Sequence, residues 1–286
     1  MTGRLGEIEA RIAGVRDLRE VVTAMRGIAA ARTTQAQAHL ASIAAHADIV
    51  AAGLADALAR LSDAGGAPPD SRPGGRTALL LVLGEHGFVG AFNEPLVAAA
   101  AAEHYDQLLV LGSRGVRAAR ERGLVVNWSR PMPTQARAVT ATAREVTTEL
   151  YRHVASGQVG SVVVIRAVPL HGGRSEVVRQ LLLPLDYSRI PPRRSLVAPL
   201  SHLEPGHLVE RIAREYVLAE LSRVVMEGFA SENGARLAAM QASRHNIDER
   251  LGSLSGEART VRQGEITSEV LDIVTGSEAL ASQADA

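Results

Sequence analysis

The chain contains no cysteine, no lysine and few aromatic residues. Without cysteine it can form no disulfide, thiol nucleophile or thiolate metal site. All 31 basic residues are arginines, which excludes a Walker-A lysine, a Schiff-base lysine and a Ser-Lys dyad. Aromatic residues make up only 3% while alanine, valine and leucine are abundant, a composition that favours slender helical packing. The formal net charge is zero, so bulk electrostatics favour neither nucleic acid nor an anionic membrane as a partner.

Proline is absent from both ends of the chain. All 12 prolines lie between Pro68 and Pro205, and a proline inside a helix costs roughly 3 kcal/mol. The two flanks can therefore form long uninterrupted helices. No run approaches the ~20 consecutive apolar residues that span a bilayer, and the charged start does not resemble a signal peptide. We therefore expect a soluble protein.

Apolar residues recur in both flanks at the three- and four-residue spacing of a helix. In the N-terminal flank they are Leu5, Ile8, Ile12, Val15, Leu18, Val22, Met25 and Ala29, followed by a seam of small residues from Ala29 to Ala38. A C-terminal helix over residues 206–280 would be about 110 Å long at ~1.5 Å per residue, and nothing that long is stable alone. We therefore expect an antiparallel coiled coil of the two flanks, in which the longer C-terminal helix extends past its partner.

Between the flanks, short apolar runs alternate with helix-like stretches. The expected strands are 78–83, 108–111, 124–127, 161–167 and 177–183, and the expected helices are about 94–103, 113–121 and 136–155. This alternation predicts a small Rossmann-like α/β domain with a mainly parallel sheet. The predicted domains are an N-terminal coiled-coil helix (1–66), an α/β domain (75–195) and a C-terminal coiled-coil helix (205–286) that pairs with the first.

The stretch LLLVLGEHGFVGAFN places Gly84, Gly87 and Gly90 between a strand and a helix. Such a turn could present backbone N–H groups to a phosphate. Its spacing is GxxGxxG rather than GxGxxG, and a tight turn without a ligand is the alternative. His86 and His171 could be ligating or catalytic residues, or ordinary loop histidines. Because no HExxH motif and no nucleophile elbow occur, we expect no catalytic residue, no cofactor and no metal site.

Two further features could be surfaces that bind another protein. Arg114, Arg117, Arg120 and Arg122 form a basic helical patch, which is either a solvated face or a docking surface for an acidic partner. Near the C-terminus, the segment RQGEITSEVLDIVTG sets Gln263 into one helical stripe with the apolar residues Ile266, Val270 and Ile273. An apolar stripe of this kind requires a surface to pack on.

Two terminal helices around an α/β insert form a layout that resembles the gamma subunit of F-type rotary ATPases, the central stalk of that machine. The stretches that carry the resemblance are VTAMRGIAAAR (22–32), GEHGFVGAFN (84–93), FASENGARLAAMQAS (229–243) and RQGEITSEVLDIVTG (262–276). They reach from one end of the chain to the other. Thr23, Glu85-His86, His245-Asn246 and Arg259 depart from the family pattern and look more like the alternative N-type branch, whose members are proposed to move sodium ions.

The resemblance implies a non-catalytic rotor subunit, present in one copy per complex. It would couple ion flow through the membrane c-ring to ATP synthesis or hydrolysis in a ring of three alpha and three beta subunits. An epsilon subunit is a further implied partner, nucleic acid is not, and the implied location is the cytoplasmic face of the bacterial cell membrane. The residues that the resemblance places where shaft and ring interact are Met25, Arg236, Gln263, Thr267, Glu269 and Asp272. For Gln263 the alternative is a buried polar residue that sets the register of the coiled coil.

Two other functions stay open on the sequence. One is a coiled-coil scaffold or sensor whose α/β domain binds a ligand, which would require a pocket at residues 84–90. The other is a small autonomous α/β enzyme with helical arms. The lack of lysine, cysteine and any convergent motif argues against the enzyme.

Overall fold

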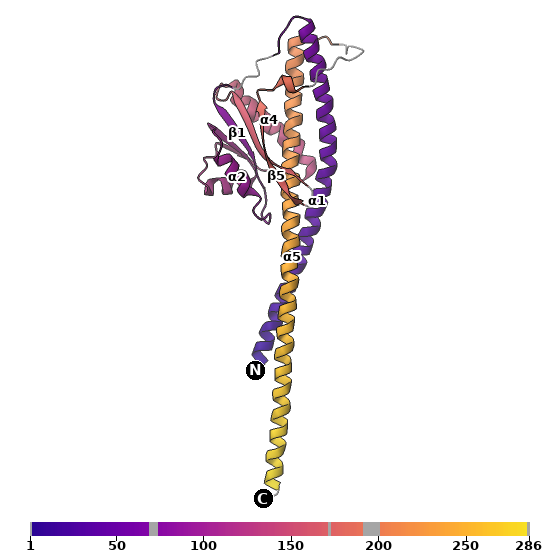
Figure 1. Cartoon of the computed structure of the whole chain (residues 1–286), viewed down its shortest axis with the longest axis vertical. Helices are drawn as coiled ribbons and strands as arrows, with labels where there is room; N and C mark the ends of the chain where they lie inside the picture. The colour runs from indigo at the N-terminus through magenta and orange to yellow at the C-terminus, as the bar shows by residue number, and fades with distance from the viewer. Residues whose placement is uncertain (1, 69–73, 171–172, 191–200, 285–286) are drawn as a thin grey trace. The chain divides into compact units, whose positions relative to one another are not determined.

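Two long helices, α1 (Thr2–Asp63) and α5 (Pro205–Ala284), flank an α/β region in the sequence (Figure 1). The computed structural model describes residues 2–68, 74–170, 173–190 and 201–284. The elements between the long helices are β1 (Thr77–Val82), α2 (Asn93–Ala101), β2 (Gln107–Leu111), α3 (Ser113–Glu121), β3 (Trp128–Arg130), η1 (Ala136–Ala138), α4 (Val139–Ala155), β4 (Ser161–Pro169), β5 (Ser175–Leu183) and η3 (Tyr187–Arg189). This order confirms the predicted fold class.

By its internal contacts the chain divides into two units, each containing part of both long helices. Unit 1 comprises Met1–Gly27 and Met240–Ala286, and unit 2 comprises Ile28–Ala239. The division falls inside the helices rather than at their ends, because the middle of α1 and the first part of α5 pack on the sheet. The three-segment division drawn from the sequence stays a prediction.

The sheet of unit 2 has the strand order β3-β2-β1-β4-β5. β1 is parallel to both β2 and β4, β3 is parallel to β2, and β5 is an antiparallel edge strand. The predicted mainly parallel sheet is confirmed. Because the strand order reverses at β1, the crevice where ligands bind in many such sheets lies where β1 and β4 end.

One predicted strand is wrong. Residues 124–127 form no strand, and the strand at this place is Trp128–Arg130, which pairs with Leu109–Leu111 of β2. The apolar side chains of Leu124 and Val126 pack instead with the core beneath α2 and α3. Their apolar character therefore reflects burial in a connection, which periodicity does not distinguish from a short buried strand.

Alternate residues of the central strands belong to two apolar cores, one on each face of the sheet. On one face Leu80 and Leu109 pack with α4, with α5 and with Ala36 of α1. On the other face Leu79 and Leu108 pack with α2 and α3. A sheet covered on both faces explains why its strands are almost continuously apolar.

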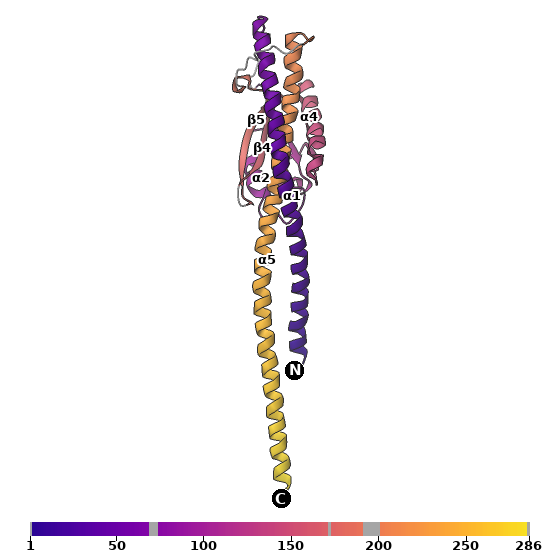
Figure 2. The ribbon, with the colours of Figure 1, turned by 90° about the vertical axis from the view of Figure 1, so that its right-hand side faces the viewer.

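Within unit 1, α1 and α5 pack side by side (Figures 1 and 2). Ile8 clusters with Leu254, and Val22 clusters with Met240. Residue numbers thus rise along α1 as they fall along α5, which confirms the predicted antiparallel pairing of the terminal helices.

Not every residue of the predicted apolar series faces the partner helix. Ile12 is 8% exposed, whereas Leu18 is 51% exposed. The position next to Leu18 turns toward α5 instead, since the Arg19 guanidinium pairs with the Asp248 carboxylate at 2.8 Å. Among the small residues further along α1, Ala29 and Ala36 are buried while Ala31 and Ala38 are exposed.

The helix α1 contains a window of 18 residues with a mean hydropathy of 1.3, so by length and composition it is apolar enough to cross a membrane. Several of its larger apolar side chains pack inside unit 2, while Ile28 and Ile49 are exposed. Leu40 and Ile43 pack against the core formed with α4 and α5. Leu54 and Leu61 lie in a cluster with Val209 of α5. The chain therefore uses these residues to join α1 to the rest of unit 2.

An Ile12→Ala variant should lower the free energy of opening of the helix pair in unit 1 by about 2–5 kcal/mol, because it leaves a cavity in the seam. The matched variant Leu18→Ala removes an exposed side chain and should change this free energy by less than about 0.5 kcal/mol. Amide hydrogen exchange of residues 247–258 measures both. Equal losses of protection in the two variants would contradict the seam described above.

Candidate functional site

The end of α5 exposes a row of large apolar side chains. Ile266, Val270, Leu271, Ile273 and Val274 are each between 46% and 71% exposed. Among the described residues, the apolar cluster that joins α1 to this part of α5 ends at Val261. A contiguous exposed apolar patch marks an interaction surface in most proteins. We call residues 263–274 the terminal stripe.

Four of the six predicted contact residues lie on this stripe. They are Gln263, Thr267, Glu269 and Asp272, and all four are exposed. The hypothesis that Gln263 is a buried residue setting the coiled-coil register is therefore wrong for this chain. The stripe combines apolar side chains with amide, hydroxyl and carboxylate groups on one helix.

The other two predicted contact residues lie elsewhere. Met25 is partly buried in unit 1, against the cluster formed by Val22 and Met240. Arg236 belongs to unit 2 and is only 6% exposed. Its Nη1 donates to Asn233 Oδ1 at 3.1 Å, so its guanidinium is engaged inside its own unit.

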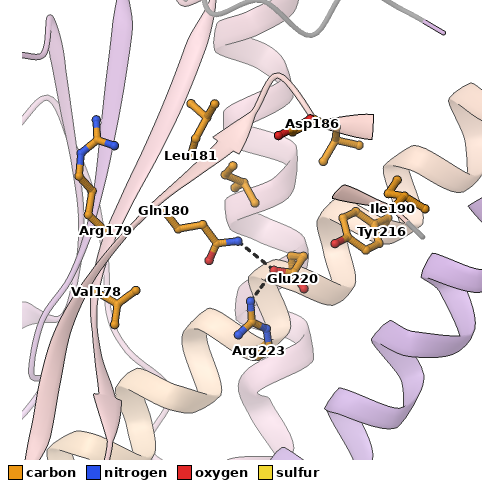
Figure 3. A pocket seen from close by; sticks show the side chains of 11 residues that line it. Val178, Arg179, Gln180, Leu181, Asp186, Ile190, Tyr216, Glu220 and Arg223 are labelled. Carbon is orange, nitrogen blue, oxygen red and sulfur yellow. Dashed lines mark hydrogen bonds and ion pairs between the residues drawn. The ribbon is translucent and has the colours of Figure 1, made fainter. Parts of the chain in front are cut away.

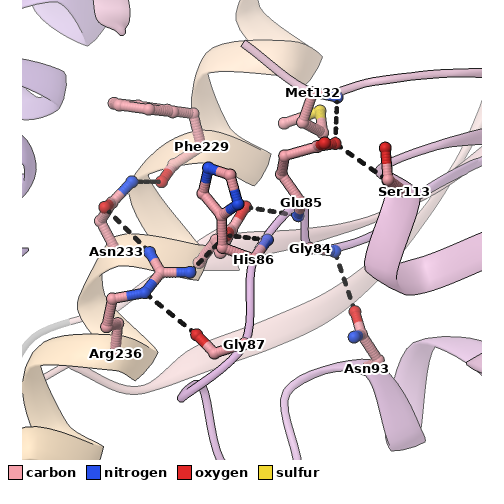
Figure 4. A network of polar contacts seen from close by, with 11 residues as sticks. Gly84, Glu85, His86, Gly87, Asn93, Ser113, Met132, Phe229, Asn233 and Arg236 are labelled. Atoms are coloured by element: carbon pink, nitrogen blue, oxygen red, sulfur yellow. Dashed lines mark hydrogen bonds and ion pairs between the residues drawn. The ribbon is translucent and has the colours of Figure 1, made fainter. Parts of the chain in front are cut away.

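The glycine-rich turn after β1 is joined to α5 by hydrogen bonds, which Figure 4 draws as dashed lines. The backbone N–H groups of Glu85 and His86 donate to the two oxygens of Glu232, each at 3.0 Å. The Arg236 guanidinium donates to the same carboxylate at 2.5 Å and to the Gly87 carbonyl at 3.2 Å. Glu232 is only 3% exposed. The backbone N–H groups that could have bound a phosphate are thus hydrogen-bonded to a side chain of the same protein.

A second carboxylate holds the other side of the turn. Glu85 accepts the N–H of Ser113 at 2.9 Å and that of Met132 at 2.8 Å. Because Ser113 is the first residue of α3, this carboxylate satisfies one of the free N–H groups at the start of that helix. The Gly84 N–H donates to Asn93 Oδ1 at 2.9 Å. Of the three glycines in this turn, Gly90 has a positive φ, at 57°. The turn is thus held by hydrogen bonds between backbone N–H groups and side chains of the same chain.

Of the two candidate histidines, the structure describes only His86. His86 contributes its backbone N–H to the turn, and His171 lies outside the described residues. Among the described residues, no group of three or more histidine, cysteine, aspartate or glutamate side chains is arranged to hold a metal ion.

A hollow of about 580 Å³ lies between β5 and α5 (Figure 3). Three of its polar side chains bind one another: Gln180 Nε2 donates to Glu220 at 3.0 Å, and Arg223 donates to Glu220 at 2.6 Å. Burial acts to lower the pKa of Arg223, but the hydrogen bonds and charges of Glu220 and Glu227 outweigh it, and the pKa is raised. These three side chains are therefore engaged by one another inside the chain.

The predicted basic patch lies on α3. Arg114, Arg117 and Arg122 line an open groove of about 560 Å³ between α2 and α3. Arg117 Nε pairs with Glu121 at 3.1 Å, and all three arginines are exposed. A solvated face and a docking surface for an acidic partner are both compatible with this exposure.

Sequence reasoning missed the buried charges of α5. Glu232 and Glu227 lie in a helix segment where almost every residue is buried. The signal that could have revealed them is a charged residue inside an otherwise apolar and small-residue stretch, because such a residue is buried only when it is paired.

Comparison with known proteins places these features in context. A family model described as ATP synthase matches residues 4–280 of the chain. The chain is 27% identical over 306 residues to the ATP synthase gamma chain of Thermobifida fusca, covering 99% of this chain and 98% of that protein. It is 29% identical over 295 residues to the ATP synthase gamma chain of Chlorobium luteolum, covering 96% and 98%.

Solved structures share the fold. The rotor of the Euglena gracilis mitochondrial ATP synthase contains a chain similar to this one, with a TM-score of 0.63 at 12% identity over 93% of this chain and 100% of that chain. The central stalk and c-ring structure of the Tetrahymena thermophila mitochondrial ATP synthase gives a TM-score of 0.57 at 19% identity, covering 78% and 99%. Both support the arrangement of long terminal helices around an α/β insert.

Proposed function

The chain belongs to the ATP synthase family, and we propose that it is the gamma subunit that forms the rotor of the central stalk. In this role it contributes no catalytic group. It converts the rotation of a membrane c-ring into changes of the nucleotide sites in surrounding alpha and beta subunits, or the reverse. Its curated relatives are gamma chains over nearly their whole length, which supports the assignment.

The observation that carries the proposal is the terminal stripe. Five large apolar side chains are exposed on α5 beyond Val261, the last residue of α5 in the apolar cluster that joins it to α1 among the described residues. A shaft that turns inside a ring needs such a surface, because it must contact the ring at every angle. Each catalytic subunit then meets a different face of the shaft, so identical sites acquire different affinities through differential contacts.

The polar residues of the terminal stripe suit a contact that must break with one subunit of the ring and form with the next. Gln263, Thr267, Glu269 and Asp272 can form hydrogen bonds that break and re-form with water as the shaft turns, whereas a wholly apolar contact would bind too tightly to move. We include the partly buried Met25 as a contact of the beta subunits. We leave out Arg236, because its guanidinium is engaged by Glu232 and Gly87 inside unit 2.

The proposed partners are three alpha and three beta subunits, an epsilon subunit and the c-ring, with one copy of this chain per complex. The proposed location is peripheral, at the cytoplasmic face of the bacterial cell membrane. Purification of the tagged chain from its host tests the assignment. Recovery of alpha, beta and epsilon subunits near three, three and one supports it, and recovery of the chain without them contradicts it.

A Gln263→Leu variant should assemble normally and keep its helix pairing, but lose at least half of its coupling between ATP hydrolysis and ion pumping. The reason is that the amide is exposed, so its loss changes contacts with the ring and not the fold of the chain. Gln241→Leu is the matched control, because Gln241 is also an exposed amide on the unit 1 part of α5. Coupling is measured as ion pumping per ATP hydrolysed. A change in thermal stability with full coupling would contradict this role for Gln263.

A further inference from the structure

The carboxyl edge of the sheet in unit 2 has the features of an anion site. The turn after β1 stands at the reversal of strand order, where sheets of this kind bind the phosphates of their ligands. Two successive backbone N–H groups, those of Glu85 and His86, point toward one position. Successive N–H groups arranged in this way form a concave site for an anion.

The anion at this position is the Glu232 carboxylate. Both of its oxygens accept a backbone N–H, and the Arg236 guanidinium neutralises its charge at 2.5 Å. Two N–H donors and one arginine are the partners that a bound phosphate receives in comparable turns. Glu232 and Arg236 are 3% and 6% exposed, so they close the site to solvent.

The same contacts connect the turn rigidly to α5. Glu232 and Arg236 are one helical turn apart on α5, and together they contact three successive residues of the turn, Glu85, His86 and Gly87. Apolar packing between α5 and the sheet resists separation but is not directional. Hydrogen bonds to a charged group are directional, so they fix both the rotation of the helix about its axis and its position along that axis relative to the sheet.

We propose that Glu232 is a positioning residue that occupies the anion site of the α/β fold with a carboxylate of its own chain. The resulting connection of five residues, 85–87 with Glu232 and Arg236, is the turn–helix joint. It resists turning and sliding of α5 against the sheet, together with the ion pair between Arg166 of β4 and Glu227 of α5. The mechanical consequence rests on the proposed rotor function: part of the torque that reaches the sheet of unit 2 passes into α5 through this joint.

The test on the isolated full-length chain uses chemical rescue. Glu232→Ala leaves an empty site lined by two N–H groups and a guanidinium, so this variant should unfold at lower temperature than the wild type. Sodium phosphate should raise its melting temperature more than sodium chloride of equal ionic strength does, and should not do so for the wild type. Glu103→Ala is the matched control, because Glu103 also pairs with an arginine, Arg179, but away from the turn. Equal effects of phosphate on both variants would overturn the anion site.

A second variant keeps the test decisive if Glu232→Ala does not fold. Glu232→Gln preserves the size of the side chain and removes its charge. Hydrogen exchange of the Glu85 and His86 amides should become about tenfold faster or more, since a hydrogen bond to a charged acceptor is replaced by a weaker one. Unchanged exchange of these two amides would overturn the proposal.

The mechanical role is tested in the assembled complex. Complexes that carry Glu232→Gln should hydrolyse ATP at the normal rate, but their stalling torque, measured with a bead attached to unit 2, should fall at least twofold. Normal torque despite phosphate rescue of Glu232→Ala would overturn the joint and leave the anion site intact. If the wild-type chain formed no complex with alpha and beta subunits, the proposed rotor function would be wrong. The phosphate rescue of the isolated chain would still test the proposed anion site.

Discussion

A Gly112→Ala variant is expected to lose about 3 kcal/mol or more of the free energy of unfolding of unit 2. Gly112 joins β2 to α3 and has a φ of 105°, a region that residues with a side chain rarely adopt. A Cβ at this position would lie 2.4 Å from the Leu83 carbonyl oxygen and 2.7 Å from that of Gly84. The methyl group therefore adds a clash with the backbone after β1 to the strain of the dihedral angle.

The matched control is Gly123→Ala. Gly123 also has a positive φ, 82°, but a Cβ there would meet no atom within 4 Å. This variant should lose only the conformational part, about 1–2 kcal/mol. Urea unfolding followed by the fluorescence of Trp128, the single tryptophan and a β3 residue, reports on unit 2 for both variants. Equal losses of unfolding free energy in the two variants would contradict the close approach of the Leu83 and Gly84 carbonyl groups to Gly112.

The second large effect is expected at a buried ion pair between the sheet and α5. Arg166 of β4 is 3% exposed, and its Nε donates to the Glu227 carboxylate of α5. Its Nη1 donates to Gln180 at 2.8 Å. Arg166→Met should destabilise unit 2 by about 3–5 kcal/mol, because it leaves a buried carboxylate with less than its full set of partners.

A double variant separates the charge from the packing. Arg166→Met with Glu227→Gln removes both charges and should recover part of the loss, since a neutral amide is less costly to bury than an unpaired carboxylate. Arg179→Met is the control on the neighbouring strand. Arg179 is 55% exposed and pairs with Glu103, so its loss should cost about 0–1 kcal/mol. A double variant whose loss of stability relative to the wild type equals the sum of the losses of the two single variants would contradict the coupling of the pair.

Much of the fold could be predicted because its signals are local. The confinement of prolines between Pro68 and Pro205 allowed two long helices, and the three- and four-residue spacing of apolar residues identified their buried faces. Strands of the parallel sheet appeared as continuous apolar runs, since both of their faces are covered. Where the local signal was ambiguous, the prediction failed: the apolar residues at 124–127 are buried in a connection and form no strand.

The candidate site was only partly accessible to the same reasoning. The terminal stripe was visible because its residues are neighbours on one helix, and the structure adds that they are exposed. The role of Arg236 was not visible, because it depends on Gly87, a residue 149 positions away in the sequence. The functional group that matters most at the turn, the Glu232 carboxylate, belongs to another element of the chain entirely.

By itself the sequence determined the two long helices and their antiparallel pairing, the mainly parallel sheet and the position of the glycine turn. These follow from composition and from periodicity within a few residues of each position. Only the tertiary structure decided that Leu18 leaves the seam, that Gln263 is exposed, and that Glu232 fills the turn. Such contacts depend on how one helix is rotated and placed against another element, and residues 146 or 147 positions apart carry no local signal of that placement.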